Sequence, residues 1–250
     1  MAMARTIERL QPIPVRAGNG ALGRASFAIR RAVDLQLHTI CLFLKHNLSE
    51  MNGDVLDVGC GEMPFRSMLP SAAKYTGVDV PNAAIFGMGK HPEKRTFDGR
   101  TLPFPPASFD YVICTEVLEH AQFPQLLLDE MRRVLRPGGR IFVTVPFSAR
   151  VHHIPHDYQR FTHIMLAAMF ADFRGVRITE RGNDLAVIAN KLIVVAMRLA
   201  QPSWHSVWRL PALLALAPVG MVFLILAHLS LRFGFGSRDD PLGYAISAQR

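Results

Sequence analysis

The residues best placed to do chemistry lie in a glycine turn that follows an apolar run. Asp57, Gly59 and Gly61 belong to the segment Asp-Val-Leu-Asp-Val-Gly-Cys-Gly at positions 54–61, and a second apolar run ends near Asp79. Glycines in such a turn let the backbone approach a ligand closely, and an acidic residue about 20 positions further on can bind ribose hydroxyls. The spacing therefore predicts a site for a nucleoside-containing cofactor.

The details of the turn indicate which cofactor this is. The dinucleotide fingerprint requires a third glycine three residues after Gly61, where this chain has Pro64, so NAD and FAD are disfavoured. Asp57 would repel a pyrophosphate, but its carboxylate suits a cofactor with a cationic amino-acid end. These features favour S-adenosyl-L-methionine.

Four segments in order resemble the class I, seven-stranded S-adenosylmethionine-dependent methyltransferases, in the branch with a DVGCG turn and a VLEH helix start. They are DVLDVGCGEMPF at 54–65, YTGVDV at 75–80, TFDGRTLPFPPASFDYVICTEVLEH at 96–120 and EMRRVLRPGGRIFVTVPF at 130–147. The resemblance implies an enzyme with an α/β, Rossmann-like fold. Its sheet would have seven mostly parallel strands with an antiparallel last strand, and helices on both faces.

The resemblance also implies which residues contact the cofactor. Asp57 would bind the ammonium of the methionine moiety, Asp79 would accept the ribose hydroxyls, and Asp98 would accept from the exocyclic amine of adenine. The full set is Asp57, Gly59, Cys60, Gly61, Asp79, Val80, Asp98, Gly99 and Thr115.

Titratable side chains gather in the segment HHIPHDYQRFT at 152–162, which we expect at the carboxyl edge of the sheet. A hydroxyl acceptor would need a base. We predict His153 or His156 as that base, oriented by Asp157, with His120 as a further catalytic candidate. The alternative is that these histidines bind substrate or cap a helix.

Glu116, Glu119 and His120 raise the possibility of a metal site. Their Glu-x-x-Glu-His pattern is similar to the divalent-metal site of ubiquinone-pathway O-methyltransferases and of small-RNA terminal 2′-O-methyltransferases. That similarity implies Mg²⁺ that binds two vicinal oxygens of an acceptor. The VLEH signature also occurs in relatives without a metal, where Glu119 and His120 begin a helix, so both readings stay open.

The chain divides into a mobile N-terminus at 1–20, a methyltransferase domain at 21–182 and 237–250, and an apolar helical insert at 183–236. A helix is expected over 22–48 and another over 124–135, with strands near 54–58, 75–80, 111–115 and 140–145. Residues 173–181 and 244–249 predict the last two strands. In the resembled fold these two are joined by a short loop, so the insert is an addition.

The insert contains apolar runs at 185–200 and 210–231, and the second is long enough to cross a bilayer. A single crossing would put the last strand on the far side of the membrane, so we expect a re-entrant or in-plane helical pair. Four cations near its ends suit anionic headgroups: Lys191, Arg198, Arg209 and Arg232. The alternative is that both helices pack on the domain or against a second subunit.

Composition limits the partners. The formal net charge of +8 and the pI near 9.9 predict attraction to anionic surfaces. Nucleic acid is disfavoured because no RNA-binding module accompanies the charge. Three scattered cysteines indicate a reducing compartment. A secretory signal is not supported, because the first 20 residues contain no apolar segment.

These observations predict a cytoplasmic enzyme that is peripheral or monotopic on the inner face of the cytoplasmic membrane. Its expected acceptor is apolar or lipid-linked: a lipid, a quinone or a lipid-linked glycan. A nucleic-acid or soluble small-molecule methyltransferase, or a non-catalytic cofactor-binding scaffold, is the alternative. The sequence leaves the oligomeric state open.

Overall fold

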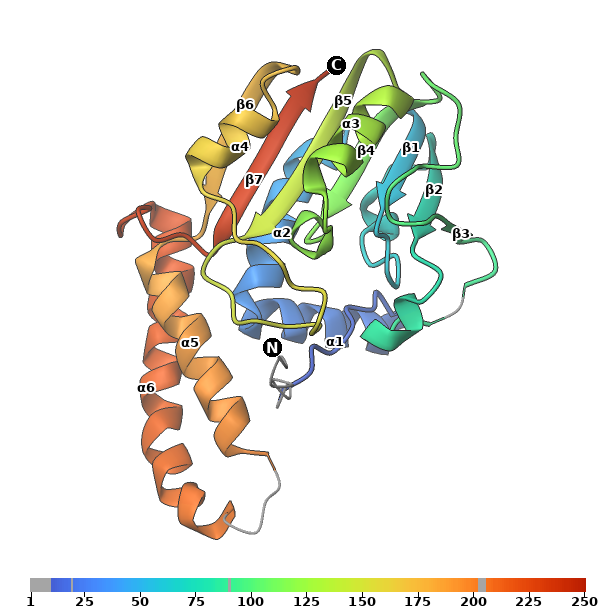
Figure 1. Cartoon of the computed structure of the whole chain (residues 1–250). Helices are drawn as coiled ribbons and strands as arrows, with labels where there is room; N and C mark the ends of the chain where they lie inside the picture. The colour runs from blue at the N-terminus through green and yellow to red at the C-terminus, as the bar shows by residue number, and fades with distance from the viewer. Residues whose placement is uncertain (1–9, 19, 90, 202–205) are drawn as a thin grey trace, which may run out of the picture.

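The protein is a seven-stranded sheet covered by helices, with a helical hairpin that projects from one edge (Figure 1). The computed structural model describes residues 10–18, 20–89, 91–201 and 206–250. The strands are β1 (Gly53–Val58), β2 (Ala73–Asp79), β3 (Arg95–Thr96), β4 (Phe109–Thr115), β5 (Leu135–Pro146), β6 (Arg174–Arg181) and β7 (Gly243–Gln249). They pair in the order β3-β2-β1-β4-β5-β7-β6, and β7 runs antiparallel to both of its neighbours. The predicted fold class is confirmed.

The helices are α1 (Gly20–Val33), α2 (Leu35–Leu48), α3 (Pro124–Val134), α4 (His163–Met169), α5 (Asp184–Leu199) and α6 (Ser206–Phe233). Helices α3 and α4 cover one face of the sheet, and α2 covers the other (Figure 1). Side chains of a strand alternate between faces, so in β1 Leu56 packs in the cluster beneath α3 and α4 while Val55 packs against α2. Burial on both faces explains the apolar run of residues 112–114 at the centre of β4.

The helix expected over 22–48 is in fact two helices. The backbone is extended at Asp34, whose carboxylate accepts a hydrogen bond from the Leu37 amide at 3.1 Å and so caps α2. Because of this break, α1 can turn beneath the carboxyl edge of the sheet while α2 packs on its face. The helix expected over 124–135 ends at Val134, and β5 follows directly from Leu135.

Residues 1–9 and 19 of the expected mobile N-terminus lie outside the described part of the chain. Residues 10–18 form neither helix nor strand. The Arg30 side chain donates to the carbonyls of Ile13 and Pro14, which holds this segment along α1.

The insert forms a hairpin of α5 and α6 whose two ends meet at the same edge of the sheet. Asn183 caps α5 by accepting from the Ala186 amide, and its side-chain amide donates to Ser230 Oγ and to the Phe235 carbonyl, each at 2.9 Å. Among the described helices, one is long and apolar enough to cross a membrane. It covers Arg209–Phe233, with a mean hydropathy of 2.4, and 6% of its most apolar window is buried.

A buried arginine joins four elements at the carboxyl edge. Arg181, 3% exposed, donates to Glu116 Oε1 at 2.7 Å, Thr39 Oγ1 at 3.1 Å, the Val145 carbonyl at 3.2 Å and the Tyr244 carbonyl at 3.3 Å. A buried guanidinium is costly unless its donors are paired, and here acceptors surround it. This side chain therefore fixes β6, β7 and α2 against the ends of β4 and β5.

Replacing Arg181 tests that role. We expect Arg181→Met to lower the free energy of unfolding by about 3 to 5 kcal/mol, because it leaves the Glu116 carboxylate without its cationic partner. The measurement is urea unfolding followed by circular dichroism. Arg177→Met, an exposed position on the same strand, is the matched control. Equal stability of the two variants would contradict the role.

Candidate active site

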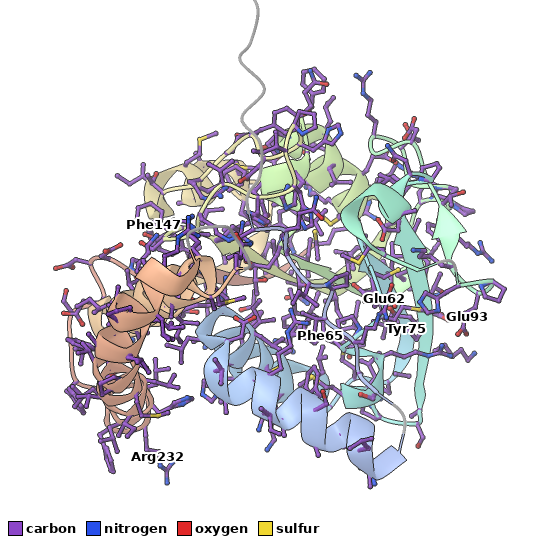
Figure 2. All side chains as sticks on the ribbon, turned by 90° about the horizontal axis from the view of Figure 1, so that it is seen from below. Glu62, Phe65, Tyr75, Glu93, Phe147 and Arg232 are labelled. Carbon is purple, nitrogen blue, oxygen red and sulfur yellow. The ribbon has the colours of Figure 1, made fainter. Side chains whose placement is uncertain are left out.

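A cavity of about 1090 Å³ lies at the carboxyl edge of the sheet. Figure 2, a view from below, shows α1 and the hairpin side by side across this edge, and His228 of α6 contacts the Ala32 carbonyl of α1 at 2.7 Å. One end of the cavity is formed by strand ends and their loops: Gly59, Cys60, Gly61, Asp79, Val80, Asp98, Gly99 and Thr115. The other end is mainly apolar and is formed by α1, α2 and α5: Ile29, Val33, Leu37, Ile40, Ile193, Val194 and Met197.

The glycine turn after β1 has the backbone angles and the close packing that its sequence predicts. Gly59 and Gly61 have φ values of 70° and 51°, in the left-handed region that favours glycine. A Cβ atom on Gly59 would collide with the side chain of Val117. The Gly61 amide donates to Asp79 Oδ2 at 3.0 Å, which fixes the turn against the end of β2.

Asp79 is 8% exposed and lines the cavity beside this turn. Its Oδ1 accepts from the Val80 amide at 2.8 Å, and Lys94 Nζ lies 3.8 Å from Oδ2. Burial raises the pKa of Asp79, whereas the backbone donors and Lys94 oppose that shift. A carboxylate has about four lone-pair sites, so these contacts leave capacity for a ligand hydroxyl.

Asp57 lies beneath the turn and is not among the cavity-lining residues. The Tyr75 hydroxyl donates to Asp57 Oδ2 at 2.7 Å, while Oδ1 is buried without a hydrogen-bond partner among the described residues. Burial raises the pKa of Asp57 to about 7. The contact between Asp57 and the ammonium of the methionine moiety stays a prediction. Oδ1, beneath the turn, is the oxygen that would make it.

The remaining predicted cofactor residues line the cavity on the side of β2 and β4. Asp98 is exposed, and its Oδ1 accepts from the amides of Arg100 and Thr101 at 2.8 and 2.7 Å. The Thr101 and Arg100 amides lower the pKa of Asp98. Gly99, with a φ of 81°, follows in the same turn. Cys60 is a buried thiol, and burial raises its pKa.

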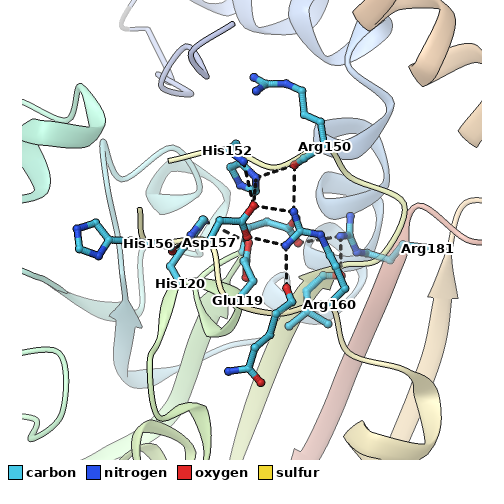
Figure 3. Close-up of polar contacts among 11 residues, drawn as sticks. Glu119, His120, Arg150, His152, His156, Asp157, Arg160 and Arg181 are labelled. Atoms are coloured by element: carbon cyan, nitrogen blue, oxygen red, sulfur yellow. Dashed lines mark hydrogen bonds and ion pairs between the residues drawn. The ribbon is translucent and has the colours of Figure 1, made fainter. Parts of the chain in front are cut away.

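Four histidines from two segments line the cavity near Thr115: His120, His152, His153 and His156. Figure 3 shows Asp157 between His152 and Arg160, and it accepts two hydrogen bonds from Arg160 at 2.6 and 2.8 Å. Asp157 Oδ2 also accepts from the His152 amide at 2.9 Å and lies 3.3 Å from His152 Nδ1. Asp157 therefore orients His152, whereas the sequence reasoning paired it with His153 or His156.

His152 is the residue that sequence reasoning did not single out. Its partner lies five residues away in an irregular loop, so no periodicity indicates which ring faces the carboxylate. His156 has a different partner, since its Nδ1 lies 3.2 Å from the Tyr158 hydroxyl. Spacing alone could not distinguish the three histidines of this loop.

The three residues predicted to hold Mg²⁺ do not converge. Glu116 is paired with Arg181, as described above, and Glu119 is completely buried, with neither carboxyl oxygen hydrogen-bonded to a described residue. Burial raises the pKa of Glu119 well above its usual value and lowers that of His120 to about 4. Within the described ranges, the potential metal ligands that lie within 4.8 Å of one another are His120, His152 and His153.

Comparison with known proteins supports the interpretation of the cofactor end. Residues 56–143 match a family model described as a methyltransferase domain. The chain is 25% identical over 162 residues to the ubiquinone biosynthesis O-methyltransferase of Coxiella burnetii (strain Dugway 5J108-111). That match covers 55% of this chain and 69% of the relative.

Solved structures share the fold at low sequence identity. The [4+2]-cyclase SpnF has a TM-score of 0.54 and 20% identity, with 86% of this chain and 82% of that chain covered. A SAM-dependent methyltransferase from Archaeoglobus fulgidus has a TM-score of 0.53 and 17% identity, with 90% and 99% covered. With the glycine turn, the buried Asp79 and the strand order, the family match identifies residues 56–143 as an S-adenosylmethionine-dependent methyltransferase domain, and the solved structures show that the chain shares the class I fold.

Proposed function

We propose that this methyltransferase O-methylates an apolar or lipid-linked acceptor, such as a lipid, a quinone or a lipid-linked glycan, at an anionic membrane surface on the cytoplasmic side. The observation that carries the proposal is the continuity of the cavity. Its polar end contains the cofactor residues, and its apolar end is formed in part by α5, the first helix of the hairpin. An acceptor in the apolar end would therefore lie next to the cofactor.

The polar end fits S-adenosylmethionine in two respects. The glycine turn leaves space for a ligand, and Asp79 offers acceptor capacity for ribose hydroxyls. Beneath the turn, the unpartnered Asp57 oxygen is suited to a water that bridges it to the ammonium. When bound, the cofactor supplies a methyl group on a sulfonium leaving group. The task of the chain is to position the acceptor in line with that group and to exclude water.

The hairpin supports a membrane surface as the source of the acceptor. Large apolar side chains are exposed along α6, among them Leu214 at 65% and Val222 at 54%. An apolar surface of this extent marks an interaction site on a folded protein. Lys191 and Arg198 lie on the cavity side of α5 without an ion pair to another described residue, so they are placed to meet anionic headgroups.

The ubiquinone-pathway relative favours a quinone-like acceptor within this class, since its name describes O-methylation in ubiquinone biosynthesis. A hydroxyl acceptor has to lose its proton to a base. His153 and His156 line the cavity and are proposed for that role. We do not extend the proposal to Mg²⁺, because Glu116 is engaged by Arg181 and the three predicted ligands do not converge.

Substituting Asp79 tests the cofactor assignment. We expect Asp79→Asn to weaken binding of S-adenosylhomocysteine at least about tenfold, because a hydrogen bond to a charged group contributes about 1.5 to 3 kcal/mol. Isothermal titration calorimetry measures the affinity. Asp129→Asn, an exposed acid on α3 outside the cavity, should bind like the wild type. Unchanged affinity in Asp79→Asn would refute the assignment.

A fractionated methyl-transfer assay tests the acceptor class. The protein is incubated with methyl-tritiated S-adenosylmethionine and a bacterial extract that is then separated into lipid, RNA and small aqueous molecules. We expect label in the lipid fraction, at a level that falls with Asp79→Asn. Label confined to RNA or to aqueous molecules would overturn the proposal in favour of a nucleic-acid or soluble small-molecule acceptor.

A further inference from the structure

Three imidazole rings converge on the wall of the cavity near the end of β4. One ring nitrogen from each of His120, His152 and His153 lies within 4.8 Å of the others. The ring centroids are 4.8 Å apart for His120 and His152, 5.3 Å for His120 and His153, and 5.2 Å for His152 and His153. The rings come from two separate segments, so the cluster is a product of the fold and not of sequence adjacency alone.

Hydrogen bonds fix the orientation of two of these rings. His120 Nδ1 donates to the His156 carbonyl at 2.6 Å, and His152 Nδ1 donates to the Arg150 carbonyl at 3.1 Å beside the Asp157 carboxylate. With the proton on Nδ1, each neutral ring has its lone pair on Nε2. Metal-binding histidines have this arrangement, with the non-ligating N–H held by a carbonyl or a carboxylate.

A buried carboxyl group beside the cluster has no hydrogen bond to the described part of the chain. Glu119 is 0% exposed, and its Oε1 lies 3.6 Å from His120 Nε2. Buried side-chain oxygens usually have a hydrogen-bond partner or a bound ion. A ligand held at His120 would lie next to these oxygens.

We propose that His120, His152 and His153 form a binding site for a transition-metal cation of the Zn²⁺ class, with Glu119 as the nearest further donor. Imidazole nitrogen suits Zn²⁺ and its neighbours in the first row, whereas Mg²⁺ prefers an octahedral set of oxygens. The donor set is thus different in both residues and metal from the predicted Mg²⁺ site. Tetrahedral Zn²⁺ with bonds of about 2.0 Å places its ligand nitrogens about 3.3 Å apart, so the rings close slightly on binding.

The site faces the same cavity as Thr115 and the glycine turn. If the proposed O-methylation holds, a cation on this wall lowers the pKa of an acceptor hydroxyl that binds to it, and the base is then His156, because the lone pair of His153 is given to the metal. The metal site itself rests on the geometry of the histidines and not on the identity of the acceptor.

Cobalt titration of the full-length protein tests the site. The protein is purified in mild detergent without a polyhistidine tag and is stripped of metal with a chelator. Co²⁺ is then added while the visible absorption is recorded. We expect saturation at one Co²⁺ per chain, displacement by an equimolar amount of Zn²⁺, and no displacement by a large excess of Mg²⁺.

Matched variants assign the ligands. His152→Ala and His153→Ala should each weaken Co²⁺ binding at least tenfold, whereas His46→Ala, an exposed histidine on α2 outside the cavity, should bind like the wild type. Circular dichroism establishes that each variant is folded. Because two ligand variants are tested, the result does not depend on the folding of one of them.

Absence of saturable binding, unchanged binding in both ligand variants, or equal displacement by Mg²⁺ would overturn the proposal. Because the titration needs neither acceptor nor methyl transfer, its failure is distinct from failure of the lipid assay.

Discussion

The antiparallel strand β7, held between β5 and β6, is the constraint on which the rest of the molecule depends. Since β7 begins at the carboxyl edge, the chain has to leave β6 and return to β7 at that same edge. The junction is tight, because a Cβ atom on Gly243 would collide with the Val145 carbonyl and with the Arg181 guanidinium. The inserted hairpin is therefore anchored at the edge where the glycine turn lies, whatever its own sequence.

This constraint divides the active site into two halves of different origin. The cofactor half is formed by the ends of β1, β2 and β4, which are elements that every sheet of this type possesses. The acceptor half is formed by the N-terminal segment, α1, the loop after β5 and α5. Under the proposed function, selectivity for the acceptor resides in these added elements, and the apolar side chains of α5 and α6 suit a lipid surface.

The sequence predicts the buried strands and the glycine turn of the cofactor half because local rules govern them. Apolar runs identify the buried strands, and positive φ angles at Gly59 and Gly61 follow from the need for a sharp turn. The acceptor half depends on contacts between distant residues, which spacing does not encode. The ion pair of Glu116 with Arg181 joins distant parts of the chain, and the pairing of Asp157 with His152 depends on an irregular loop.

Flotation with vesicles tests most directly the claim that the hairpin places the active site at a membrane. We predict that the wild-type protein and Ile164→Glu, which changes an exposed residue on α4, float with vesicles containing phosphatidylglycerol. The double variant Leu214→Glu/Val222→Glu on α6 should stay at the bottom of the gradient, because buried charge opposes insertion of the helix. Wild-type protein that stays at the bottom with these vesicles, or a double variant that floats equally well, would contradict the account.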